Sequence, residues 1–301
     1  MLFFSTSSFG KLRIGLIYTG DSFPIYHGKV AKFYENQGVD VDIVNFMSAM
    51  ERDSALQAGS IDGANGDLIG ASLMYHSHKN IQVTGLTLGD QFNIRRVSLL
   101  VSDPNIKEPK DLKGREVAIS PNTIIEYLLH RLLKKENISS ADVKTSSVNN
   151  IPLRLTLLEQ KKLTAALLPE PLASKAVVDG SKILIDDKND FYSHAVVVFR
   201  KDALNKKGAE VKKFMEALAK TVDVINKNPE SYRESIADRC RVPSAVKDSF
   251  FLYKYAYEKL PSLELFNDVQ DWLIETKKLP SKIPYQGLIN EQYYRSQPAK
   301  V

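Results

Sequence analysis

Hydrophobic and polar positions along the chain repeat one order of elements twice. A nearly continuous apolar run comes first, followed by a helical stretch that a glycine ends, an alternating strand and a second helical stretch, and the same order then returns. Continuous apolar runs are typical of strands covered on both faces, and alternation is typical of half-exposed strands. The repeated order of strand, helix, strand, helix and strand predicts two similar α/β lobes with a cleft between them.

The two copies align closely enough to give an offset. Placing Leu56 over Leu158 gives 158 − 56 = 102 residues, and Asp40-Val41 falls on Asp142-Val143 at the same offset. Around both leucines the pattern indicates the end of an amphipathic helix, a short polar turn and a brief apolar strand. We therefore expect a duplicated half that faces its twin across a gap.

After residue 200 the pattern becomes helical. Amphipathic spacing predicts four helices, over Val211–Asn226, Pro229–Asp238, Ala245–Leu260 and Asp268–Thr276. A helical segment without a sheet of its own has to pack on an existing lobe, and lobe one is the expected place. The expected boundaries are 11–98 for the first part of lobe one, 99–195 for lobe two and 196–301 for the return to lobe one.

Composition indicates an ordinary globular protein. The 301 residues are 43% hydrophobic, which supplies one or two cores without disulfides, and Cys240 is the single cysteine. The net charge is +5, yet the 41 basic and 36 acidic residues are mixed along the chain, so we expect no nucleic-acid partner. No apolar run reaches the roughly 18 residues that a membrane span needs.

The first ten residues, MLFFSTSSFG, show neither the charged start nor the cleavage pattern of a secretory leader. Two interpretations stay open at this point. The protein is cytoplasmic, or a leader was removed or replaced when this chain was made.

Candidate binding residues lie where strands end. Ligands of open α/β sheets bind outside the carboxyl ends of strands, near helix N-termini that offer unpaired N–H groups. The loops at these ends predict a ligand-binding set of Tyr18, Asp21, Ser22, Asn65, Asp67, Asp90, Gln91, Phe92, Ser120, Asn122, Thr123, Glu170 and His194.

Each of these residues also has a structural interpretation. Ser120, Asn122 and Thr123 at a helix start could hold an anionic group or simply cap the helix. The aspartates could pair with a cationic ligand or cap helices, as Asp67 would. Tyr18 and the other strand-end aromatic could stack on a flat ring or belong to the core.

No catalytic set, metal site or cofactor motif is expected. His76 and His78 are two residues apart and therefore point to different sides of a helix, and His194 stands alone. The chain has no G-x-S-x-G, phosphate-loop or G-x-G-x-x-G motif. These observations favour a protein that binds without reacting.

Six pieces of sequence, in order, carry a resemblance to a known family. They are LRIGLIY, FYENQGVDVDIV, ALQAGSIDGA, EPKDLKGREVAIS, LLEQKKLTAALLPEPLASKA and KKFMEALAKTVDVINKNPESY. Over Leu12–Lys254 the chain resembles the substrate-binding proteins of ABC importers for nitrate, sulfonates, taurine and thiamine precursors. The most specific pieces are Asp111–Gly114 and Pro169–Pro171.

The resemblance implies the type II periplasmic-binding fold, an α/β fold of two lobes. Two crossover strands, near Asn93–Leu100 and Ala195–Arg200, would join the lobes, and the C-terminal helices would pack on lobe one. It also implies a monomeric solute-binding protein, periplasmic or attached to the cell surface. This protein would capture a small polar molecule, anionic or heteroaromatic, by hinge closure and deliver it to an ABC transporter permease.

One alternative function uses the same scaffold. Related folds include enzymes of pyrimidine (thiamine precursor) and menaquinone biosynthesis, although the Cys-rich stretch of the pyrimidine-synthesising kind is absent here. A ligand-sensing domain of a regulator would normally carry a helix-turn-helix segment or linker, which this sequence lacks.

Overall fold

The computed structural model describes residues 10–89, 95–188, 190–242, 246–256 and 259–293. It contains two five-stranded sheets with the orders β2-β1-β3-β10-β4 and β7-β6-β8-β5-β9. The first sheet consists of β1 (Leu12–Ile17), β2 (Val41–Phe46), β3 (Gly63–Gly66), β4 (Ile81–Leu88) and β10 (Ala195–Arg200). The second consists of β5 (Val97–Val101), β6 (Glu116–Ile119), β7 (Lys144–Ser147), β8 (Ala165–Pro169) and β9 (Lys182–Asp186). We call the two halves built on these sheets lobe one and lobe two.

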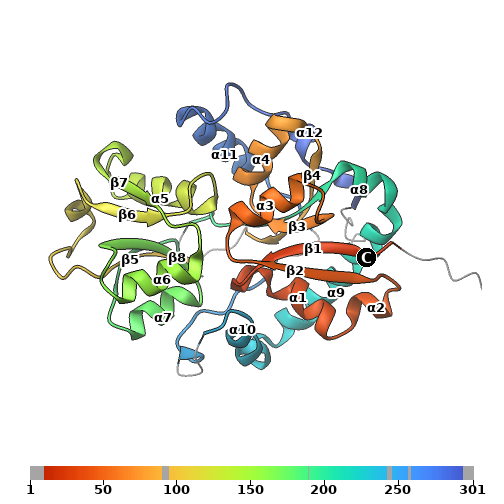
Figure 1. Cartoon of the computed structure of the whole chain (residues 1–301), viewed down its shortest axis with the longest axis horizontal. Coiled ribbons are helices and arrows are strands. Elements are labelled where there is room, and N and C mark those ends of the chain that lie inside the picture. Colours follow the sequence, from red (N-terminus) through yellow and green to blue (C-terminus); the bar gives the residue numbers. More distant parts are fainter. Residues whose placement is uncertain (1–9, 90–94, 189, 243–245, 257–258, 294–301) are drawn as a thin grey trace, which may run out of the picture.

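The two sheets share one pairing pattern. In lobe one, β1 pairs in parallel with β2 and β3, and β10 runs antiparallel between β3 and β4. In lobe two, β6 pairs in parallel with β7 and β8, and β5 runs antiparallel between β8 and β9. The two-lobed α/β fold expected from the repeated sequence pattern is confirmed (Figure 1).

Helices flank both sheets. Lobe one carries α1 (Phe23–Val30), α2 (Phe33–Asn36), α3 (Ala49–Gln57), α4 (Leu68–His78), α8 (Lys201–Lys206) and α9 (Gly208–Lys227). Lobe two carries α5 (Ile124–Lys135), α6 (Ile151–Glu159) and α7 (Leu172–Val178). The chain continues through α10 (Arg233–Arg239), α11 (Leu263–Glu275) and α12 (Tyr285–Leu288). No helix in the described ranges combines the length and apolar character needed to cross a membrane.

The C-terminal helices pack mainly on lobe one, and one of them also reaches lobe two. The helix α9 packs against α1 and α2, and α11 packs against α4. Asp268 of α11 also accepts hydrogen bonds from Arg131 Nε at 2.8 Å and from the Tyr127 hydroxyl at 2.5 Å, both on α5. The C-terminal segment therefore connects the two lobes along one side of the molecule (Figure 1).

The predicted helix over Ala245–Leu260 is wrong for the residues that the structure describes. The chain turns at residues 246–250 and then runs without regular secondary structure to Ala256. Phe250, Tyr253 and Tyr255 are buried, with exposed Lys254 between the two tyrosines. Backbone N–H groups of this segment bond to other elements, as Ala256 does to the Thr87 carbonyl at 3.0 Å, so tertiary hydrogen bonds replace the helical ones.

Candidate functional site

A small cavity lies between the two lobes, at the carboxyl ends of their central strands. Its volume is about 80 Å³. Its walls include apolar side chains of both lobes, among them Ile17, Leu88, Ile125, Leu128 and Ile151. The polar residues on its walls are Thr19, Asp21, Arg52, Asp67, Arg96, Ser120, Thr123, Ser193, His194 and Tyr253.

The lobe-one wall presents a carboxylate that its neighbours hold in place. Asn65, buried at the end of β3, donates from Nδ2 to Asp21 Oδ2 at 2.7 Å and accepts from the Thr87 hydroxyl at 2.7 Å. The Thr87 bond fixes which way the amide of Asn65 points, because a hydroxyl that donates requires the amide oxygen as its partner. Asn65 therefore orients Asp21, which lines the cavity, without lining it itself.

A second acidic group of lobe one stands beside an arginine. Asp67 is the N-cap of α4 and accepts from the Gly70 N–H at 2.8 Å. Burial raises the pKa of Asp67 more than the Arg52 charge and the backbone N–H groups of Gly70 and Ile124 lower it. Since Ile124 begins α5 of lobe two, the Asp67 carboxylate touches both lobes.

Arg52 is buried on α3 and largely neutralised. Its Nε donates to Asp53 Oδ1 at 2.8 Å, and its Nη1 donates to the Asn65 carbonyl at 2.8 Å. Burial raises the pKa of Asp53, and the Arg52 charge opposes that rise. Arg52 therefore lies at the cavity wall as a cation that is already paired with the Asp53 carboxylate.

His194 enters the site as a neutral ring with a defined tautomer. Its Nε2 accepts from the Leu68 backbone N–H at 3.0 Å, and Nδ1 lies 2.8 Å from the Tyr192 carbonyl. The first contact requires a lone pair on Nε2, so the proton is on Nδ1 and is donated to Tyr192. Burial and the nearby Arg96 charge lower the pKa of His194 to about 4, although the bond to Tyr192 opposes the shift.

Buried ionic groups also flank the segments that cross between the lobes. Arg96 precedes β5 and is 1% exposed. Its backbone N–H and that of Val97 donate to Asp187 Oδ1 at 2.8 and 3.0 Å, and Ser193 donates its hydroxyl to the same carboxylate. Burial lowers the pKa of Arg96, and the charge of Asp187 opposes that shift.

The lobe-two wall is formed by the loop between β6 and α5. Thr123 is the N-cap of α5: its hydroxyl accepts from the Ile125 N–H at 3.2 Å and donates to the Ser120 carbonyl at 2.7 Å. The Ser120 hydroxyl accepts from Arg154 Nη1 at 2.8 Å. Thr123 therefore has no further hydrogen to donate to a ligand, whereas Ser120 keeps its own.

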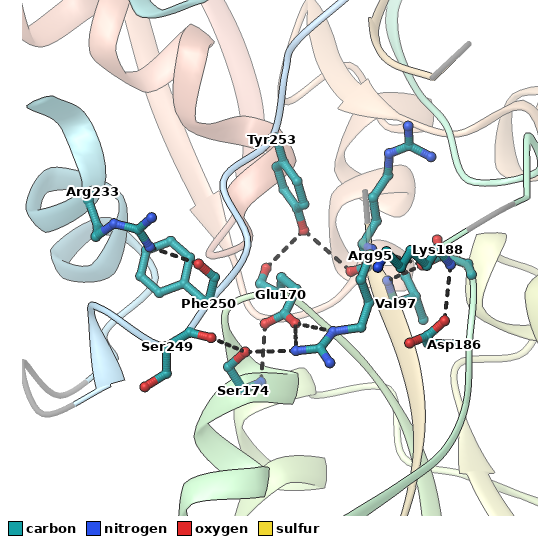
Figure 2. Close-up of polar contacts among 12 residues, drawn as sticks. Arg95, Val97, Glu170, Ser174, Asp186, Lys188, Arg233, Ser249, Phe250 and Tyr253 are labelled. Atoms are coloured by element: carbon teal, nitrogen blue, oxygen red, sulfur yellow. Dashed lines mark hydrogen bonds and ion pairs between the residues drawn. The ribbon is translucent and has the colours of Figure 1, made fainter. Parts of the chain in front are cut away.

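The segment 246–256 closes one side of the cavity by contacting lobe two. The Tyr253 hydroxyl lies 3.0 Å from the Glu170 carbonyl and 3.4 Å from the Arg96 carbonyl. Figure 2 shows Tyr253 pointing toward this group, in which Arg95 Nε donates to Glu170 Oε1 at 2.9 Å and Ser174 donates its N–H to Glu170. Ser174 also donates its hydroxyl to the Ser249 carbonyl at 3.3 Å. The contacts tie the end of β8 to the C-terminal part of the chain.

The expected ligand-binding residues divide into three groups. Those that line the cavity are Asp21, Asp67, Ser120, Thr123 and His194. Those that lie outside its lining are Tyr18, Ser22, Asn65, Asn122 and Glu170. Those that fall outside the described residues are Asp90, Gln91 and Phe92.

The residues that miss the cavity have other partners. The Tyr18 ring is covered by the guanidinium of Arg241 at 3.9 Å, and Ser22 donates its hydroxyl to the Ile17 carbonyl at 2.7 Å. Asn122 is exposed and accepts from Lys278 Nζ at 2.7 Å. Glu170 turns to Arg95, as described above.

Five polar residues of the cavity are not in the expected ligand-binding set, namely Thr19, Arg52, Arg96, Ser193 and Tyr253. A signal for Arg52 exists, because it follows Ala49 by three residues and precedes Leu56 by four, which puts a cation on the apolar face of a helix. Tyr253 was hidden by the wrong helix prediction. Among the described residues, no three His, Cys, Asp or Glu side chains are grouped so as to hold a metal ion.

Comparison with known proteins identifies the family. The model of the family described as NMT1/THI5 like matches residues 19–232, more than half of the chain. The chain belongs to the NMT1/THI5-like family. No curated protein matches its sequence.

Solved structures with the same fold include members of several functional classes. The alkanesulfonate-binding protein SsuA from Xanthomonas axonopodis pv. citri, bound to MOPS, has a TM-score of 0.79 at 18% identity, over 93% of this chain and 98% of that one. The periplasmic nitrate-binding protein NrtA from Synechocystis PCC 6803 has a TM-score of 0.73 at 13% identity, over 94% and 87%. The desulfurization enzyme DSZB has a TM-score of 0.71 at 12% identity, over 94% and 97%. The periplasmic-binding fold and the resemblance to importer binding proteins are confirmed for this NMT1/THI5-like chain.

Proposed function

We propose that this NMT1/THI5-like protein is a solute-binding protein that encloses a small polar molecule, anionic or heteroaromatic, between its lobes. The observation that carries the proposal is the cavity of about 80 Å³, because charged and polar side chains of both lobes meet on it. Cavities with apolar walls and a few placed polar groups are the usual form of small-molecule sites. The alkanesulfonate and nitrate binders that share the fold make sulfonates and nitrate the first candidates to test.

Binding would be coupled to closure of the lobes. Asp21 comes from lobe one and Ser120 from lobe two, so a ligand that contacts both gains its full set of contacts only when the lobes are together. A ligand with higher affinity for one conformation shifts the population toward it. Contacts beside the cavity, such as Tyr253 with Glu170, would add to the closed state.

The chemistry of the described cavity residues favours binding over reaction. A nucleophile needs a neighbouring base with a free lone pair. The Nε2 lone pair of His194 accepts from Leu68, and the Ser193 hydroxyl donates to Asp187. Cys240 is buried outside the cavity lining, and burial raises the pKa of its thiol.

The partner and the location are further parts of the proposal. We infer an ABC transporter permease as the partner and the periplasm or the cell surface as the location, by analogy with the binding proteins that share the fold. Fractionation of the native source tests the location. Recovery with the cytoplasmic fraction would favour the biosynthetic-enzyme alternative.

The decisive experiment measures stabilisation and turnover on the same samples. The purified chain is heated with alkanesulfonates, nitrate or aminopyrimidines, and each mixture is then analysed by mass spectrometry for new products. We expect one ligand class to raise the melting temperature while its mass stays unchanged. Appearance of a product would reject the binding function in favour of an enzyme, and the absence of any shift would reject these ligand classes.

A further inference from the structure

The helix α6 buries a cation behind the lobe-two wall of the cavity. Arg154 lies on the apolar face of α6 with Ile151, Leu155 and Leu158, and its side chain is 0% exposed. Arginine is rarely buried to this extent unless it is paired with an acid. The position therefore calls for a compensating charge.

The described residues supply hydrogen-bond acceptors for only part of the guanidinium. Nη1 donates to the Ser120 hydroxyl oxygen at 2.8 Å and to the Val148 carbonyl at 3.0 Å. Nε and Nη2 have no acceptor, and no carboxylate of the described chain forms an ion pair with this arginine. Burial lowers the pKa of Arg154 to about 9, so the group still carries its charge at neutral pH. A buried charge without a counter-charge is costly, so a group other than the described side chains should compensate it.

Ser120 links the charge of Arg154 to the cavity. Its oxygen accepts from Arg154, so its own hydrogen is left to donate, and Ser120 lines the cavity. A hydroxyl that accepts from a cation becomes a stronger donor. The neighbouring start of α5 is already contacted by the Asp67 carboxylate, which leaves Ser120 as the donor on this side. On the lobe-one side, Asp21 presents an acceptor.

We propose that Arg154 determines ligand specificity by acting through Ser120, and that the ligand is dipolar. A negatively charged acceptor group binds at Ser120, and an amino or other donor group binds at Asp21. Arg154 itself is a positioning residue, because it polarises and orients Ser120 and does not touch the ligand. The inference rests on the proposed binding function and extends it to the charge of the ligand.

A pair of probes with the same shape tests the inference. 4-Aminobenzoate and 4-aminobenzamide both carry a donor for Asp21 and differ in charge at the other end, and calorimetry measures the affinity of the wild-type protein for each. We expect the acid to bind at least about tenfold more tightly than the amide, as for hydrogen bonds to charged groups. In Arg154→Met this ratio should fall to about one.

Three further variants separate specificity from folding. Arg154→Lys keeps the charge and should restore a preference for the acid, and Ser120→Ala should lose it. Ser98→Ala, which alters a buried serine of β5 outside the cavity lining, should keep the wild-type ratio. The ratio of two affinities on one protein is insensitive to a general loss of stability.

The outcomes distinguish this inference from the function on which it rests. Equal affinities in the wild type, or an unchanged ratio in Arg154→Met, would overturn the role of Arg154. If a neutral molecule co-purifies with the protein and binds, the binding function stands and the dipolar ligand is rejected. If neither probe binds and no small molecule co-purifies, both proposals are rejected.

Discussion

The helices α3 and α6 occupy equivalent positions in the two lobes, and each carries one buried arginine. They differ in whether that arginine has an acidic partner. Both have nine residues, and their starts are 151 − 49 = 102 residues apart. Ser48 and Asn150 cap them by accepting from the N–H three residues ahead, at 3.2 and 2.9 Å. Arg52 and Arg154 follow at the same offset and are both buried. The two helices therefore share their length, the position of their cap and a buried arginine.

The difference lies in the next residue. Asp53 pairs with Arg52, whereas Leu155 stands at the equivalent position beside Arg154. Lobe one thus neutralises its buried cation from within, and lobe two leaves the charge of Arg154 to be balanced by something else. Two walls with the same backbone arrangement can therefore differ in the charge that they offer to a ligand.

The strongest test of this comparison removes each arginine in turn. Arg52→Met leaves the partly buried Asp53 without its partner, so the free energy of unfolding should fall by about 3 kcal/mol, the lower end of the range for buried pairs. Arg154→Met loses two hydrogen bonds but also removes an unbalanced buried charge, so the change should be about 1 kcal/mol or less. Urea denaturation measures both, and equal losses would show that the two arginines are compensated alike.

The pH dependence of stability tests whether His194 is held neutral, because a protonated His194 would add a further cation beside Arg52 and Arg96 at the cavity. His194 has a pKa of about 4 in the folded protein, below the usual 6.5. Between these values the unfolded chain takes up a proton that the folded chain does not, so stability falls as pH is lowered from about 6.5 to about 4. His194 should contribute about 3 kcal/mol to this loss, and its contribution should disappear in His194→Gln.

The control for this measurement is His76→Gln, since His76 is an exposed histidine of α4. Its pH profile should match that of the wild type. A His194→Gln profile as steep as the wild-type one would show that His194 is not held neutral.

A smaller effect separates capping from binding within lobe one. Asp67→Ala and Ser48→Ala each remove an N-cap, and each should lower the free energy of unfolding by about 1 kcal/mol. Asp67 lines the cavity and Ser48 does not, so only Asp67→Ala should also weaken ligand binding, by about 1–3 kcal/mol. Calorimetry on both variants checks this, and equal affinities would make Asp67 a helix cap alone.

The smallest effect concerns a residue of the α5 turn that points away from the cavity. Asn122 is exposed and bonded to Lys278, so Asn122→Ala should leave ligand affinity unchanged within about 0.5 kcal/mol. Ser120→Ala, two residues earlier, is the contrasting variant. A clear loss of affinity in Asn122→Ala would place the ligand on the outer side of this turn.

Much of the fold was predictable because local patterns in the sequence specify the repeated strands and helices. Apolar runs, the glycine stops and the residues that cap helices define the strands and helices of both lobes, and the strand ends located Asp21, Asp67 and Ser120. The prediction of a helix over Ala245–Leu260 was wrong because aromatic residues of this segment pack against residues that are distant in the sequence. Tertiary contacts of this kind override local preference.

The charge balance of the site could not be predicted from position alone. Glu170 lies at the end of β8, where a ligand contact was predicted. Its carboxylate instead accepts a hydrogen bond from Arg95, and it does not line the cavity. Arg52 and Arg154 sit on apolar helix faces, which marks them as unusual, but whether each has an acid partner depends on three-dimensional neighbours. Side-chain direction, which spacing does not encode, decided these cases.

The most direct test of the central claim, that the cavity between the lobes binds the ligand, is native mass spectrometry of the wild-type chain and of Ala49→Phe. Ala49 lines the cavity, so a larger side chain there should fill it. We expect the wild-type protein to carry one additional small mass that Ala49→Phe lacks while remaining folded. The same bound mass on both proteins would contradict the claim.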